Sequence, residues 1–155
     1  MQNLVIMTVK SSQCRINSDL NKLPEVVTWF EQFKDSSLPK EIWLQANMAI
    51  IEGFTNAVRH AHANLSSDTP VLVKADLSDQ TFSFEIWDQG EFYDFDSTLE
   101  KLDQIIKSPD FDPLAREKQW GGVIFLKLIQ QFKWTINYIR HEDAENCLKA
   151  VVNLS

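Results

Sequence analysis

The chain has few cysteines and histidines and no long hydrophobic run. Cys14 and Cys147 stand far apart in a sequence of 155 residues, so they provide neither a disulfide framework nor a metal-ligand cluster. The three histidines lack cysteine or carboxylate neighbours at ligand spacing, which argues against zinc. No run approaches the roughly 18 apolar residues of a membrane span, and no secretory signal is visible. We therefore expect a cytoplasmic protein with reduced thiols and no membrane contact.

Positive charge is also scarce. Fifteen lysines and arginines face 22 aspartates and glutamates, giving a net charge of −7 and a pI of about 4.9. This balance argues against direct binding to DNA or RNA, whose affinity depends on phosphate neutralisation. It does not exclude a nucleotide, which needs only a local positive site. The length predicts one domain, residues 1–155, with a single core.

Hydrophobic periodicity outlines the elements. β-rich or alternating segments predict strands at residues 4–9, 71–77, 82–87, 134–140 and 148–154. Helical spacing predicts helices at residues 20–34, 38–63, 97–106 and 123–132, and Ser97-Thr98-Leu99-Glu100 reads as a capping box. The short turn between the second and third strands predicts a hairpin. This order favours an α+β fold, a two-layer sandwich with a mixed, mostly antiparallel sheet and helices on one face.

The second predicted helix carries a polar stripe. At about 100° per residue, Glu52, Asn56 and Arg59 share one face, and His60 is offset by about 80° from Glu52. An Asn oxygen suits Mg²⁺, a Glu can act as a base, and an Arg suits phosphate. The alternative is an ordinary solvated face. The opposite side is interpreted as core, and it carries Leu44, Met48, Ile51, Phe54 and Val58.

The chain has only four glycines, so their positions are informative. Gly90 follows a predicted strand and Asp88, while Gly121 and Gly122 open a predicted helix, where backbone N–H groups can bind phosphate. Asp88 could accept hydrogen bonds from a ligand such as an adenine amino group. The alternatives are that Asp88 caps the turn at Gly90 and that Gly121 begins an ordinary helix. Residues 108–119 form a long predicted loop, a length that is more often functional than accidental.

The order of these motifs resembles the GHKL superfamily of ATP-binding domains. Glu-x-x-x-Asn-Ala-x-x-His lies on a helix, a hairpin ends in Asp-x-Gly, and a loop precedes a helix opened by glycines. This is the Bergerat fold shared by DNA gyrase, sensor histidine kinases and anti-sigma-factor serine kinases. The resemblance runs from Ile16 to Leu154, and the short length is most similar to the anti-sigma-factor, partner-switching kinases.

The resemblance implies ATP and Mg²⁺ as ligands and assigns roles to residues of this sequence. It implies that Asn56 holds Mg²⁺ between the phosphates and that Glu52 is the general base toward the attacking hydroxyl. Asp88 would read adenine, with Gly90 beside the base. Residues 108–119 would be the ATP lid. The residues implied on the phosphate side are Arg59, His60, Arg116, Lys118, Gly121 and Gly122.

Two positions depart from the family pattern. Phe92 stands where a second glycine usually follows Gly90, and Val123 or Ile124 stands where another glycine is expected after Gly122. A β-branched side chain does not readily adopt positive φ. These departures bear on phosphate affinity and kinase activity more than on the fold.

The resemblance implies an anti-sigma regulatory factor that phosphorylates a serine of an anti-sigma-factor antagonist of the STAS type. It implies a sigma factor as a second partner, and close family members commonly form homodimers. A first alternative is a non-catalytic module that binds ATP, or no nucleotide, and regulates a protein partner by docking. An ATP hydrolase or histidine-kinase fragment ranks last, because the chain has no second domain to supply a phospho-acceptor histidine. An α+β domain with a coincidental resemblance also stays open.

Overall fold

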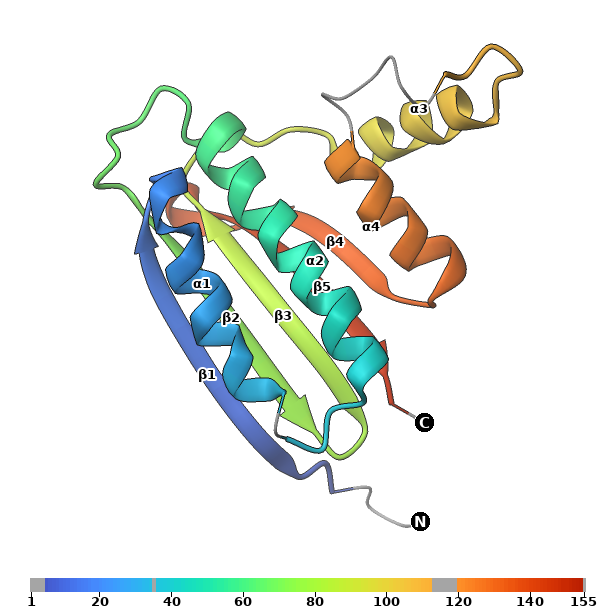
Figure 1. Cartoon of the computed structure of the whole chain (residues 1–155). Helices are drawn as coiled ribbons and strands as arrows, with labels where there is room; N and C mark the ends of the chain where they lie inside the picture. Colours follow the sequence, from blue (N-terminus) through green and yellow to red (C-terminus); the bar gives the residue numbers. More distant parts are fainter. Residues whose placement is uncertain (1–4, 35, 113–119, 155) are drawn as a thin grey trace.

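A five-stranded sheet forms the back layer of the protein (Figure 1). The computed structural model describes residues 5–34, 36–112 and 120–154. The strand order is β1-β2-β3-β5-β4, and each of the four pairings between these described strands is antiparallel. The strands are β1 Thr8–Asn17, β2 Pro70–Ser78, β3 Thr81–Asp88, β4 Thr135–Arg140 and β5 Asn146–Asn153. The sheet is therefore antiparallel throughout the described part of the chain, not mixed.

The helices form the second layer, on one side of the sheet. In Figure 1, α1 and α2 lie across β1 to β3, and α4 lies in front of β4 with α3 beyond it. The main helices are α1 Leu23–Phe30, α2 Lys40–Asn56, α3 Phe95–Lys107 and α4 Trp120–Gln131. Short turns are η1 Leu20–Lys22, η2 Glu31–Phe33, the π-helical η3 Ala57–Ala61 and η5 Glu142–Ala144. No described helix has the length and apolarity to cross a membrane. The predicted α+β two-layer sandwich is confirmed.

The hairpin of β2 and β3 supplies the centre of the core. Both strands alternate strictly between buried and half-buried residues, as the sequence pattern predicted. Phe82 of β3 contacts the rings of Phe30 and Phe33 at centroid distances of 6.0 and 5.9 Å, and that of Trp134 at 6.3 Å. These contacts join α1, η2 and the start of β4 to the hairpin in one aromatic cluster.

The buried side of α2 differs from the prediction. Leu44 and Met48, predicted as core, are 47% and 53% exposed. Small residues face the sheet instead, and a Cβ on Gly53 would lie 2.2 Å from Ile86 Cδ1. Close packing of α2 on β3 therefore accommodates a Cβ at this position only if the end of the Ile86 side chain shifts. The buried residues of α2 are Trp43, Ala46, Ala49, Ile50, Gly53 and Phe54.

Some predicted boundaries are wrong, as the first strand and helix α3 show. The first strand was predicted at residues 4–9, but β1 runs from Thr8 to Asn17 because pairing with β2 decides its extent. Helix α3 begins at Phe95, two residues before the predicted capping box. Asp94 is its N-cap, and the Asp94 carboxylate accepts a hydrogen bond from the Ser97 backbone N–H at 3.0 Å.

Candidate functional site

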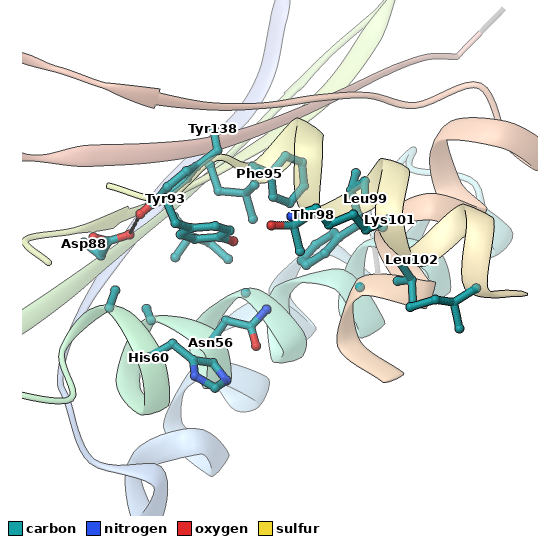
Figure 2. Close-up of a pocket in the computed structure, with 18 residues that line it drawn as sticks. Asn56, His60, Asp88, Tyr93, Phe95, Thr98, Leu99, Lys101, Leu102 and Tyr138 are labelled. Atoms are coloured by element: carbon teal, nitrogen blue, oxygen red, sulfur yellow. Dashed lines mark hydrogen bonds between the residues drawn. The ribbon is translucent and has the colours of Figure 1, made fainter. Parts of the chain in front are cut away.

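A cavity of about 440 Å³ lies between the end of α2 and α3 (Figure 2). Strands β3, β4 and β5, turn η3 and helix α4 complete its wall. The volume falls within the roughly 300–1,000 Å³ typical of small-molecule sites. The lining residues are Gly53, Asn56, Ala57, His60, Ala61, Ile86, Asp88, Tyr93, Phe95, Thr98, Leu99, Lys101, Leu102, Ile105, Gly122, Phe125, Tyr138 and Leu148. The lining is mostly apolar with a few polar groups, as expected of a ligand site.

The polar groups lie in distinct places along this cavity. Figure 2 shows Asp88 and Tyr138 joined by a hydrogen bond at one end, with Lys101 and Leu102 toward the other. Asn56 and His60 project from the helical segment along one side. An elongated ligand can therefore contact Asp88 and Asn56 at the same time.

The structure brings four of the predicted site residues to this cavity, namely Asn56, His60, Asp88 and Gly122. Glu52 is half-buried on α2 and Arg59 is exposed on η3, and neither lines the cavity. Gly121 lies in α4, but its surroundings are not described. Arg116 and Lys118 lie outside the described residues.

Helix geometry explains why Glu52 does not line the cavity although it lies near Asn56 around α2. Gly53, Asn56 and Ala57 span an arc of about 100°, whereas Glu52 lies about 90° from its centre. After Asn56 the helix widens into the π-turn η3, where the His62 backbone N–H donates to Ala57 O at 2.8 Å. Turns of this kind are often found at functional sites.

Asp88 closes one end of the cavity and is only 4% exposed. Its Oδ1 accepts hydrogen bonds from the Gly90 backbone N–H at 3.0 Å and from Asn146 Nδ2 at 2.8 Å. Its Oδ2 accepts one from the Tyr138 hydroxyl at 2.8 Å. Asp88 therefore caps the turn to Gly90 and also presents an oxygen at the cavity, so the two interpretations from the sequence are compatible.

The family follows from the whole-chain comparison. The model of the histidine kinase-like ATPase domain matches residues 16–152. The chain belongs to the histidine kinase-like ATPase domain family. No curated protein matches it. The predicted GHKL relationship is confirmed at this level, and membership implies that the domain binds ATP. The anti-sigma kinase subtype stays a prediction.

Gly90 of this ATPase domain is required by close packing of the backbone. A Cβ at this position would lie 2.0 Å from the carbonyl oxygen of Ala61 in η3. The Gly90 carbonyl accepts hydrogen bonds from Arg140 Nη1 at 2.8 Å and from Asn146 Nδ2 at 2.9 Å. Gly90 thus packs the end of β3 against the turn that carries His60. These contacts agree with the interpretation that Gly90 belongs to a turn capped by Asp88.

No sequence motif assigned a role to His62, which binds the backbone next to Asp88 in the ATPase domain. This histidine is 3% exposed, and its Nε2 accepts a hydrogen bond from the Gln89 backbone N–H at 2.8 Å. Because Nε2 is an acceptor, Nδ1 carries the proton and donates to Ser18 Oγ at 2.5 Å, while Ser18 donates to Thr69 O. Burial lowers the pKa of His62, although the nearby Asp88 charge opposes this shift.

Phe92, at the place of the missing family glycine, belongs to an aromatic cluster. Its ring stacks on Tyr138 with centroids 5.4 Å apart and planes 5° apart. Tyr93 lies 4.8 Å from the same ring and lines the cavity. Burial and the Asp88 charge raise the pKa of Tyr93 to about 12 and also raise the pKa of Tyr138, so both hydroxyls stay protonated at neutral pH. Tyr138 is 50 residues from Asp88, and no local pattern could have revealed the pair.

The other end of the cavity has fewer fixed polar groups. Lys101 of α3 is the only lysine or arginine among the described lining residues, and it belongs to none of the sequence motifs. Within the described residues, no group of three or more His, Cys, Asp or Glu side chains could hold a metal. A Mg²⁺ ion here would therefore depend on phosphate oxygens together with the Asn56 carboxamide oxygen, which fits the usual habit of Mg²⁺ in nucleotide sites.

Proposed function

We propose that this chain is a cytoplasmic anti-sigma regulatory factor, a serine/threonine protein kinase that uses ATP and Mg²⁺. Its substrate would be a serine of a STAS-type anti-sigma-factor antagonist, and its second partner a sigma factor. The net charge of −7 fits protein partners better than nucleic acid. A homodimer is part of the proposal, as in the family members that the chain resembles.

One observation carries the proposal. Asn56, Asp88 and Gly122 belong to three motifs far apart in the sequence, yet they line one cavity of a domain in the histidine kinase-like ATPase family. Their separate positions suit the separate parts of ATP. Asp88 would accept the adenine amino group, and Asn56 would contact the metal and phosphates. Lys101 would add positive charge to the phosphate end.

In the proposed transfer, the serine hydroxyl oxygen forms a bond to the γ-phosphorus as the bond from that phosphorus to the β–γ bridging oxygen breaks. ADP leaves, and the hydroxyl proton passes to the carboxylate of Glu52. Mg²⁺ supplies charge neutralisation at the phosphates. Glu52 lies one turn before Asn56, beside the cavity-lining side of α2 and partly exposed. This position is open to a hydroxyl that arrives on a protein substrate from solvent.

A non-catalytic docking module is the second candidate, and two observations favour it. Glu52 is not among the lining residues, and Phe92 packs on Tyr138 where the family has a glycine. In that case ATP would be a structural ligand, held mainly at Asp88.

Calorimetric titration with ATP tests the nucleotide site. We expect saturable binding that Mg²⁺ strengthens, with Asn56→Ala removing the effect of Mg²⁺ and Asp88→Asn weakening binding with or without it. The matched controls are Asn137→Ala and Asp68→Asn, since both residues are exposed and neither lines the cavity. Absence of binding at millimolar ATP would reject the kinase and the ATP-holding docking module, and would leave only a docking module without nucleotide.

Transfer of labelled γ-phosphate to candidate STAS-type proteins separates the two candidates. The kinase proposal expects phosphoserine on one of them, and Glu52→Gln should lower the rate by about 100-fold or more while ATP affinity changes little. The control Glu41→Gln alters an exposed carboxylate at the other end of α2 and should be silent. The docking module would be favoured if ATP affinity does not depend on Mg²⁺ or on Asn56 and no phosphate is transferred to any of these proteins.

A further inference from the structure

We propose that Tyr138 is a positioning residue that sets the nucleobase preference of the cavity by fixing the single free acceptor position of Asp88. The inference rests on the proposed binding of ATP in this cavity. It concerns which purine edge the site accepts.

The hydrogen bonds of Asp88 leave little capacity for a ligand. A carboxylate has about four acceptor positions, two on each oxygen. Gly90 N–H and Asn146 Nδ2 take both positions on Oδ1, and the Tyr138 hydroxyl takes one on Oδ2. One position on Oδ2 therefore remains among the described contacts, on a side chain that lines the cavity.

The Tyr138 ring is itself held firmly. Phe92 stacks on it at 5.4 Å, and the rings of Tyr93 and Phe95 lie 4.8 and 6.3 Å away. Burial raises the pKa of the Tyr138 hydroxyl, which therefore stays a donor at neutral pH. Because Tyr138 holds Oδ2 while two donors hold Oδ1, the carboxylate plane has no freedom to rotate toward a different ligand edge.

One fixed acceptor suits one N–H donor. The 6-amino group of adenine offers such a donor beside a ring nitrogen. Guanine presents two adjacent N–H donors, on N1 and on the 2-amino group, and pairing both requires two free carboxylate oxygens. Because both acceptor positions on Oδ1 are filled, the site lacks the second free oxygen that guanine requires. The arrangement thus selects 6-aminopurine nucleotides and disfavours guanine nucleotides, and Tyr138 decides where the single acceptor points.

A ligand comparison tests this role without disturbing the ring cluster. ATP and purine riboside triphosphate differ by the 6-amino group alone, so the ratio of their dissociation constants isolates the contact to Asp88. We expect the wild type to prefer ATP by about 10-fold or more, the usual range for a hydrogen bond to a charged group. Tyr138→Phe keeps the ring but removes the hydroxyl, and it should reduce the ratio to about 3-fold or less while the analogue binds nearly as before.

Tyr93→Phe is the matched control. It removes the other tyrosine hydroxyl at the cavity, which makes no hydrogen bond within the part of the chain that the structure describes. Its ratio should equal that of the wild type. If Tyr138→Phe weakens ATP and the analogue equally, or leaves the ratio unchanged or larger, Tyr138 serves only the packing and the inference is wrong. If the wild type binds neither nucleotide, the proposed function itself fails, which calorimetry on the wild type alone reveals.

Discussion

The two ends of the cavity differ in how their polar side chains are held. At the Asp88 end, backbone and side-chain donors from β4, β5 and the turn after β3 bind the carboxylate directly. Away from that end, Asn56 along one side and Lys101 toward the other end line the cavity without a hydrogen bond or ion pair within the described residues. The first end is shaped by folding, whereas no contact of this kind fixes the side chains of Asn56 and Lys101. Substitutions at the first end should therefore cost stability as well as binding, and those of Asn56 and Lys101 only binding.

Gly90→Ala should give the largest effect, at the end shaped by folding. The new Cβ would overlap the Ala61 carbonyl oxygen, and backbone on both sides leaves no rotamer to relieve the overlap. We expect the free energy of unfolding in urea to fall by about 3 kcal/mol. Gly122→Ala is the control, because its Cβ would meet only the flexible end of Leu102 at 2.7 Å. Equal losses in the two variants would contradict the difference between the ends.

Asp88→Asn should reverse the hydrogen-bond polarity that the base end presents. To keep its bonds from Gly90 and Asn146, the new amide must direct its oxygen to them and its NH₂ toward Tyr138 and the cavity. A donor then faces the adenine amino group. We expect ATP affinity to fall by about 30-fold and the free energy of unfolding by about 1–2 kcal/mol. Calorimetry and urea unfolding measure the two effects, and a loss of affinity with full stability would argue against a shared network.

The contrast between the two ends also shows which parts of the site could be predicted from the sequence. Strand alternation predicted the β2–β3 hairpin, and the turn chemistry of Asp88 and Gly90 placed both at its end, because these features are local. The partners Tyr138 and Asn146 lie 50 and 58 residues away from Asp88, and they reach it only because β5 pairs with β3 and β4 with β5. This strand order depends on pairing between segments far apart in the sequence, and no local sequence pattern predicts it.

Helix α2 shows a second kind of limit. Periodicity placed the helix but assigned Leu44 and Met48 to the core, since large apolar residues outweigh alanine and glycine in such a pattern. The sheet instead selects the small residues Ala46, Ala49 and Gly53, which allow close approach. Because this side of α2 faces the sheet, Asn56 lines the cavity and Glu52 lies beside it.

Asn56→Ala tests the part of the cavity whose polar side chains have no described partner. Because the Asn56 side chain makes no hydrogen bond within the described residues, its removal should change the free energy of unfolding by less than about 0.5 kcal/mol. ATP affinity with Mg²⁺ present should fall by about 10-fold, and affinity without Mg²⁺ should stay near that of the wild type. A loss of stability comparable to that of Asp88→Asn would show that this part is also shaped by folding.

The pH dependence of stability gives the smallest expected effect and tests His62, which binds the backbone next to Asp88. Folding lowers the pKa of His62 below its ordinary value of 6.5, because burial and the bond from Gln89 N–H favour the neutral ring. The unfolded chain then binds the proton more readily than the folded one. The contribution of His62 is therefore complete above about pH 6.5 and declines as the pH falls from there toward its folded pKa.

Urea unfolding between pH 7.5 and 5.5 should show this decline in the wild type, before ordinary carboxylates titrate. His62→Gln should flatten it, whereas His141→Gln, which alters an exposed histidine, should retain it. If both variants keep the wild-type slope, His62 does not couple proton binding to the stability of this end of the cavity.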